Sequence, residues 1–268
     1  MNLGQRAEEI FSALKQSQQQ ITIDGRTYYI VEGDLRFDAK DLKAYALEQA
    51  RRESIGPADP LPDRLLGRLD DSGHPVRWAK GKVLTYAVLR QTFADGMQYQ
   101  TVARNMRVAT AAWEATCGVN FRHLGEHENG AVVGGEVPLF TVQGHPPEGN
   151  LLALAFFPDD SVERRQIFIY PSYFSPTLTY DLVGILRHEL GHVLGFRHEH
   201  IRDEAPESFF KHEDDRNRVA PLTEYDSHSV MHYPIGGAGA KTFTITDFDR
   251  KGARSLYGPP DSEVSYYQ

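Results

Sequence analysis

The sequence lacks several features that would assign it to common classes of protein. Among its 268 residues Cys117 is the only cysteine, so no intramolecular disulfide can form, and the chain suits reducing conditions. It contains no run of 18 apolar residues, and no transmembrane helix is expected. The formal net charge is −8, which leaves no cationic excess to meet phosphates and argues against nucleic acid as a partner.

The N-terminus also lacks a continuous apolar stretch. Its first residues, MNLGQRAEEIFSALKQ, do not form the h-region of a secretory signal. We therefore expect one of three histories for the protein. The signal has already been removed, export uses a route without a visible signal, or the protein acts where it is made.

Length and composition favour one globular domain with a shorter appendage, because 40% of the residues are hydrophobic and 25% are charged. The appendage would be residues 1–70. An apolar stripe predicts a helix over residues 3–14, and β-rich runs around an Asp-Gly pair predict a hairpin over residues 21–31. A second helix follows near residues 38–52. Three prolines and a glycine interrupt residues 53–64, which we interpret as a linker.

The larger domain would be residues 71–258, followed by a tail of residues 259–268. Short, bulky, β-prone runs alternate here with longer amphipathic stretches. The expected strands cover residues 82–89, 151–157 and 166–170, and the expected helices cover residues 98–116, 180–194 and 245–258. Thr246 can cap the last helix and Gly258 can end it.

A histidine-rich motif, HELGHVLGFRH, begins at His188 in one of these helices. His188 and His192 are four residues apart, so both imidazoles lie on one face of the helix and can share a metal ion. Glu189 is one step round the helix, off the metal but within reach of a water on it. Gly195 can end the helix in a left-handed conformation and allow His198 to return as a third ligand. A lone histidine is more often a core residue, but three in register with one open position indicate a catalytic Zn²⁺ site.

A second motif, SHSVMHYP, follows in residues 227–234. Together, HELGHVLGFRHE and SVMHY resemble the zinc motif HExxHxxGxxHE and the Met-turn SxMHY of the astacin family of metzincin zinc proteases. The resemblance implies that Met231 forms an apolar floor beneath the zinc. It also implies that Tyr233 is a further zinc ligand at rest and hydrogen-bonds the oxyanion during turnover.

A third motif, Val31-Glu32-Gly33-Asp34, resembles the FxGD motif of astacin proenzymes, with Val in place of Phe. The resemblance implies that Asp34 ligates the zinc in a latent form and displaces the catalytic water. A tethered carboxylate is a competitor at high effective concentration. The alternative is that Gly33 and Asp34 form only a turn after the hairpin. Cleavage near residues 62–72 would release the segment, and the new N-terminus would be buried near Glu199.

Some features depart from the astacin pattern. The two disulfides usual in astacins cannot form, and the stretch between His198 and Met231 is shorter than in a typical astacin. The segment ITDFDRKGARSLYG also resembles the last helix of matrixins. The expected fold class is therefore α+β: a metzincin-like (zincin) catalytic domain with a twisted mixed sheet, an active-site helix and a backing helix, preceded by a small helix/hairpin prosegment.

The expected activity is that of a zinc-dependent endopeptidase, a monomer that hydrolyses proteins or peptides and is made as a latent zymogen. Glu189 would act as general base, with Tyr233 assisting at the oxyanion. The substrate would add as a strand to a sheet edge, for which residues 151–157 are the candidate; the alternative is a buried strand without substrate contact. Two other functions stay open: a zinc hydrolase of a non-protein substrate such as a cell wall, and a non-catalytic zinc-binding interaction protein. The presence of Glu189 argues against the second, since binding alone needs no base.

Overall fold

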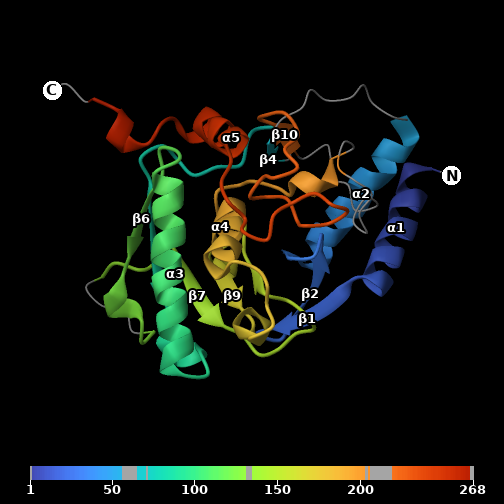
Figure 1. The fold of residues 1–268 in the computed structure, drawn as a ribbon. Helices are drawn as coiled ribbons and strands as arrows, with labels where there is room; N and C mark the ends of the chain where they lie inside the picture. The colour runs from blue at the N-terminus through green and yellow to red at the C-terminus, as the bar shows by residue number, and fades with distance from the viewer. Residues whose placement is uncertain are drawn as a thin grey trace.

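The computed structural model describes most of the chain, and Figure 1 gives its arrangement. The described residues are 2–55, 65–70, 72–130, 135–202, 205 and 219–265. Helices α1 and α2 lie side by side at one end of the molecule, α3 lies at the other end, and α4 lies between them (Figure 1). Among the described residues no helix is both long and apolar enough to cross a membrane.

The N-terminal segment, residues 2–55, has the predicted order of helix, hairpin and helix. Asn2 caps the first helix and exchanges hydrogen bonds with Gln5. Asp24 and Gly25 both take positive φ in the hairpin turn, as the Asp-Gly pair predicts. The elements are α1 (Leu3–Ser17), β1 (Gln19–Ile23), β2 (Arg26–Val31), β3 (Leu35–Phe37) and α2 (Ala39–Ile55). The three strands form one antiparallel sheet in chain order.

The rest of the described chain is built on a five-stranded mixed sheet, in agreement with the predicted α+β class. The strand order is β6-β5-β7-β9-β8, with all neighbours parallel except the edge strand β8. The strands are β4 (Leu66–Arg68), β5 (Val83–Val88), β6 (Asn120–His123), β7 (Phe140–Gly144), β8 (Ala153–Leu154), β9 (Gln166–Ile169) and β10 (Val219–Pro221). The helices are α3 (Gly96–Glu114), α4 (Leu182–Val193) and α5 (Asp247–Tyr257). The segment predicted as an edge strand does lie at the edge, although only two of its residues are strand.

Helix α3 backs the helix that carries the histidine motif. Its residues at core-facing spacing, Val102, Met106, Ala109 and Trp113, are all fully buried, as predicted. The Trp113 indole Nε1–H donates to the Arg187 carbonyl oxygen at 2.9 Å, and this bond joins α3 to α4. Such a bond fixes the direction in which α4 presents its other face.

The N-terminal segment lies on the five-stranded sheet through apolar contacts. Side chains of the β1–β2 hairpin form a buried cluster with residues near β8 and β9: Ile21, Ile23, Tyr28, Ile30, Leu151, Leu154, Phe168 and Tyr170. A second cluster, made by α1, α2 and the strands between them, includes Phe157 from the larger domain. These contacts bury apolar surface on both partners and hold the segment in place.

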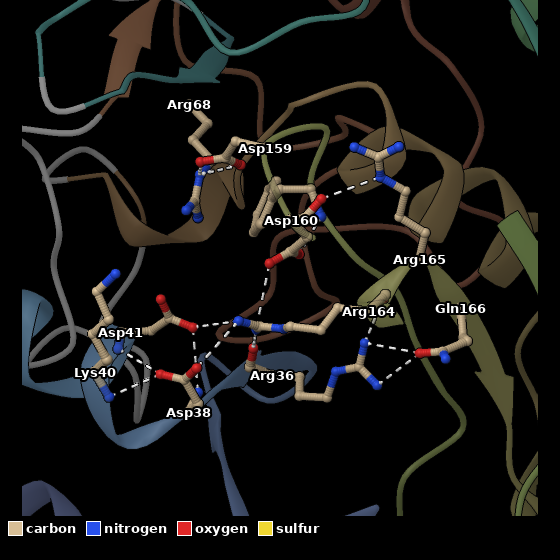
Figure 2. Close-up of polar contacts among 11 residues, drawn as sticks. Arg36, Asp38, Lys40, Asp41, Arg68, Asp159, Asp160, Arg164, Arg165 and Gln166 are labelled. Atoms are coloured by element: carbon tan, nitrogen blue, oxygen red, sulfur yellow. Dashed lines mark hydrogen bonds and ion pairs between the residues drawn. The ribbon is translucent and has the colours of Figure 1, made fainter. Parts of the chain in front are cut away.

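A polar network adjoins these clusters (Figure 2). Arg164 of the larger domain donates to the Asp41 carboxylate at 2.6 Å and to the Arg36 carbonyl oxygen at 2.6 Å. Arg36 returns a bond of 2.6 Å to the Arg164 carbonyl oxygen. Arg165 points the other way and donates to the Asp160 carbonyl oxygen within its own domain.

The chain enters the larger domain at Leu65. That side chain is 1% exposed within the main core, and β4, which follows it, pairs with β10. Arg68 N–H donates to the Gly195 carbonyl oxygen, and Arg197 N–H donates to the Leu66 carbonyl oxygen, both at 2.8 Å. Of the predicted linker, residues 56–64 lie outside the described residues, and the domain boundary at residue 70 stays a prediction.

Candidate metal centre

Helix α4 carries the first two histidines and ends at Val193, two residues before a glycine that the following turn requires. The Asp181 carboxylate caps the helix by accepting from the backbone N–H groups of Val183 and Gly184. Gly195 has φ 93°, and a Cβ there would run into the Val76 carbonyl oxygen. Because the helix stops there, the chain turns and brings His198 back beside the helix.

Three imidazoles converge on one point. Nε2 of His198 lies 3.2 Å from Nε2 of both His188 and His192, and the three side chains are almost fully buried. Asp34 from the N-terminal segment enters the same space, with Oδ1 3.0 Å from Nε2 of His198 and Oδ2 3.2 Å from Nε2 of His188. Ligand atoms of all four residues lie within 4.8 Å of one another.

The hydrogen bonds of the outer ring nitrogens decide what can occupy this point. Nδ1 of His188 donates to the Val230 carbonyl oxygen at 2.7 Å, and Nδ1 of His192 donates to the Phe196 carbonyl oxygen at 2.8 Å. Each donating Nδ1 leaves a lone pair on Nε2 of its ring. Nitrogens that converge at this distance can hold one cation between them. Zinc with Zn–N bonds of about 2.0–2.1 Å in tetrahedral geometry places its nitrogens about 3.3 Å apart, so these residues fit the ion.

The pKa shifts of the side chains at the centre also favour a positive charge there. Burial lowers the pKa of His198, but the carboxylates of Asp34 and Glu32 outweigh it and raise this pKa to about 9. Burial lowers the pKa of His192 to about 4, although Asp34 opposes the shift. Burial raises the pKa of Asp34, and the neighbouring imidazoles outweigh burial and hold it well below its usual range. The carboxylate is therefore ionised beside the histidines.

Glu189 faces the same space without joining the ligand cluster. It is 3% exposed, and its Oε2 has no hydrogen-bond partner among the described residues. Burial, together with the Asp34 carboxylate, raises the pKa of Glu189 well above its usual value. Glu189, His188 and Asp34 line a cavity of about 230 Å³, together with Ala153 of the edge strand β8.

Tyr233 lies against the histidines and Asp34. Its hydroxyl donates to Oδ2 of Asp34. Its ring stacks on that of His188, with centroids 5.3 Å apart, and lies tilted against that of His198, with centroids 4.9 Å apart. Burial, followed by the Asp34 carboxylate, raises the pKa of Tyr233 well above its usual value, so the hydroxyl keeps its proton. The ligand role predicted for Tyr233 stays a prediction, since here its hydroxyl is bonded to Asp34.

Hydrogen bonds to α5 hold the turn that carries Met231. Asp249 accepts from the Ser229 hydroxyl at 2.6 Å and from Val230 N–H at 2.8 Å. Met231 is fully buried, and its sulfur lies so close to Gly191 that a Cβ on Gly191 would overlap it. The sequence analysis named Met231 but did not find these roles of Gly191 and Asp249. The glycine of the HELGH motif was a sequence signal that could have pointed to Gly191.

Glu199, which follows the third histidine, is fully buried beneath the same turn. Its Oε1 accepts from the Asp226 N–H at 3.1 Å and pairs with Nε of Arg202 at 2.8 Å. Burial raises the pKa of Glu199 to about 8, although Arg202 opposes the shift. Its predicted contact with a new N-terminus stays a prediction.

A second carboxylate of the N-terminal segment reaches the centre, and sequence reasoning missed it. Glu32 is fully buried; its Oε1 accepts from the Arg197 guanidinium, and its Oε2 accepts from Nδ1 of His198 at 3.0 Å. Burial raises the pKa of Glu32, and Arg197 and His198 together lower it below its usual value. Glu32 thus fixes the tautomer of the third histidine, as the two carbonyls do for the others.

Comparison with known proteins agrees with this geometry. Residues 77–230 match the matrixin (peptidase M10) family model, which is more than half of the chain. Astacin-like metalloendopeptidases of Gallus gallus and Coturnix japonica are each 35% identical over 96 residues, covering 30% of this chain and 20% of the relative. The match thus spans about a fifth of the length of these relatives.

Two solved structures resemble the fold. Myroilysin is 15% identical with a TM-score of 0.49, covering 71% of this chain and 98% of that one. High choriolytic enzyme 1, a hatching-enzyme zinc protease from Oryzias latipes, is 15% identical with a TM-score of 0.45. The match covers 69% of this chain and 95% of that one. On the extent of the family-model match, the chain belongs to the matrixin family of zinc metalloproteases, within the metzincins.

Proposed function

We propose that this chain is a zinc-dependent endopeptidase held latent by Asp34. The observation that carries the proposal is the convergence of three Nε2 atoms beside a buried carboxylate oxygen of Glu189 that has no hydrogen-bond partner among the described residues. Family membership supports peptide bonds as the substrate class. A protein that only bound zinc would need the imidazoles, and burying an unpartnered carboxyl group would bring it no benefit.

Zinc held by the three imidazoles would supply Lewis acidity, which polarises a carbonyl oxygen and makes a neighbouring water more acidic. Glu189 would accept a proton from the attacking water and pass it to the leaving nitrogen. The Tyr233 hydroxyl would donate to the oxyanion. The position of Asp34 supports this assignment. Its Oδ2 accepts the hydrogen bond from the Tyr233 hydroxyl and lies 3.2 Å from Nε2 of His188. The anionic oxygen of a reacting substrate would be stabilised at the same place.

The substrate would lie along β8, with its backbone extended beside the free edge of the sheet. Leu152 and Ala153 line the cavity together with Glu189, which supports an approach of the peptide from this side. In the latent chain the residues around Gly33 and Asp34 occupy that approach. Because Leu65 is buried in the main core, we propose that the activating cleavage falls on its N-terminal side.

Activity is tested on a processed chain. The full-length protein carries a site-specific protease sequence between Ile55 and Leu65, is folded with zinc, and is then cut. We expect casein hydrolysis that requires the cut, stops with EDTA and returns with zinc. Glu189→Gln should lower the rate about 10²–10⁴-fold while the bound zinc, measured by mass spectrometry, is unchanged. A Glu189→Gln chain as active as the parent would remove the general-base assignment.

Latency is tested on the uncut chain. Asp34→Ala removes the competing carboxylate, so we expect casein hydrolysis by the uncut variant to exceed that of the uncut parent. The double variant Asp34→Ala, Glu189→Gln should lose this gain, which rules out a contaminating protease. Equal rates for the uncut parent and Asp34→Ala would argue that Asp34 forms only a turn.

We further propose that the zinc-site region is astacin-like. The motif ending in Glu199, the SVMHY turn and the 35% identity to astacin-like metalloendopeptidases over 96 residues support this assignment. An astacin-like site leads to one expectation that a matrixin site without this tyrosine would not give. Removal of the Tyr233 hydroxyl by Tyr233→Phe should lower kcat and leave KM nearly unchanged, since the bond forms to the oxyanion.

A further inference from the structure

The five-stranded sheet carries apolar side chains on the face turned away from the main core. In β9, Ile167 belongs to the main core cluster, whereas Phe168 and, just after the strand, Tyr170 belong to the cluster with the β1–β2 hairpin. In β8, Ala153 belongs to the main core cluster and Leu154 to the hairpin cluster. Since successive residues of a strand point to opposite faces, Leu154, Phe168 and Tyr170 form a patch on the outer face of the sheet, here called the outer patch.

The next strand, β7, does not continue the outer patch. Gln143 is the register partner of Phe168 and therefore points to the same face. Its Nε2 donates to Oγ1 of Thr141 at 2.7 Å, while Val142 between them belongs to the main core. The outward positions of β7 are thus polar. Large apolar side chains confined to one part of an otherwise polar face mark an interaction surface.

The N-terminal segment presents a matching apolar face to the outer patch. In β2, Tyr29 and Val31 belong to the cluster that the segment makes with its own helices α1 and α2. Tyr28 and Ile30 alternate with them and join the hairpin cluster on the larger domain, as does Ile21 of β1. The segment therefore combines a core of its own with a second apolar face that only the larger domain covers.

The residues that hold the segment differ from the residue that blocks the metal centre. The Arg36 guanidinium lies 5.2 Å from the ring of Tyr28 and 5.1 Å from the ring of Phe168, and so joins the two parts at the outer patch. Asp34 reaches the imidazoles and belongs to neither apolar cluster. None of the residues around the outer patch lies in the predicted linker, so a cut in the linker leaves all of these contacts in place.

We propose that the outer patch keeps the N-terminal segment bound after the linker has been cut, so that the cut segment persists as an inhibitor and activation needs its removal as a second step. The inference rests on the proposed latency. Departure of the segment exposes two apolar faces to water at once, which opposes dissociation. The apolar faces supply the affinity, and Asp34 supplies the block.

The test uses the full-length chain with the protease sequence between Ile55 and Leu65, folded with zinc, labelled with a dye at its N-terminus and cut to completion. In size-exclusion chromatography at about 1 µM we expect the segment to co-elute with the larger domain, since interfaces of ordinary size bind at micromolar concentrations or below. Casein hydrolysis per mole of chain should rise at least about tenfold on dilution from there. The anisotropy of the dye in the same series gives the dissociation constant without reference to activity.

Two variants separate holding from blocking. Ile21→Ala shrinks a buried side chain of the hairpin cluster, so the dissociation constant should rise at least about 30-fold. Thr22→Ala, at the exposed neighbour in β1, is the matched control and should leave it within about twofold. Asp34→Ala removes the block alone, and its cut segment should still co-elute at about 1 µM.

The outcomes separate this inference from the proposed function. A wild-type segment that elutes apart from a fully active larger domain overturns the docking and leaves the peptidase function standing. Full activity in the co-eluting complex overturns the inhibitor role, and release of the segment by Asp34→Ala overturns the assignment of affinity to the outer patch. A segment that stays bound to a zinc-loaded chain without activity at any dilution overturns the peptidase function. Since the wild-type result is decisive alone, a misfolded Ile21→Ala variant does not protect the idea.

Discussion

Arg164→Met should loosen the N-terminal segment without touching the metal centre. Arg164 is 13% exposed and joins the two parts of the chain through Asp41 and the Arg36 carbonyl oxygen (Figure 2). The bond to the Arg36 carbonyl oxygen is a charge-assisted, half-buried hydrogen bond, worth about 1.5–3 kcal/mol. The Asp41 carboxylate is 35% exposed, so its contribution is discounted to about 0.5 kcal/mol. The sum is at least about 2 kcal/mol, or about 30-fold in affinity.

The assay is the activity of the processed chain as the cut complex is diluted. The concentration at which half of the activity appears gives the dissociation constant of the segment, and Arg164→Met should raise it about 30-fold. Arg165→Met is the matched control, because Arg165 bonds only to the Asp160 carbonyl oxygen of its own domain in this network. A dissociation constant for Arg164→Met within twofold of the parent would refute the reasoning.

Three further predictions concern the support of the centre. Asp249→Ala removes the acceptor of three buried or half-buried donors, so the free energy of unfolding should fall by about 3 kcal/mol in thermal melts; Asp247→Ala, at a 95% exposed carboxylate, should not change it. Gly191→Ala forces a methyl group against Met231 and should cost about 1–3 kcal/mol, whereas Gly4→Ala in α1 should be neutral or stabilising. Burial raises the pKa of Cys117 to about 12, so at pH 8 a disulfide reagent should label it only after unfolding.

The sequence predicted those helices and strands whose apolar pattern and capping residues lie within one short stretch of the chain. Helices α3 and α5 were visible because apolar spacing and capping residues lie within one window, and Thr246 does form the predicted reciprocal cap with Asp249. The central strand β7, with the sequence FTVQG, was not predicted. It is short, and its pairing with β5 and β9 involves residues far away in the chain. The predicted edge strand shrank to Ala153–Leu154 because β9 pairs with only that part.

The candidate site divides in the same way. The histidine ligands and Glu189 could be predicted from the spacing of residues within one short motif. Glu32 and Arg197 are 165 residues apart, and each alone looks like an ordinary surface charge. Only the docking of one segment on another reveals that both are fully buried. No periodicity or turn signal encodes such a pair, so it had to come from the structure.

The net charge of −8 does not describe the charge where the two parts of the chain meet. Three acidic groups of the N-terminal segment pair with basic or metal-site groups of the larger domain: Asp34 with the imidazoles, Glu32 with Arg197, and Asp41 with Arg164. Removal of the segment would therefore take three carboxylates away from this surface. The potential that a peptide meets is set by those local charges and not by the sum over the chain.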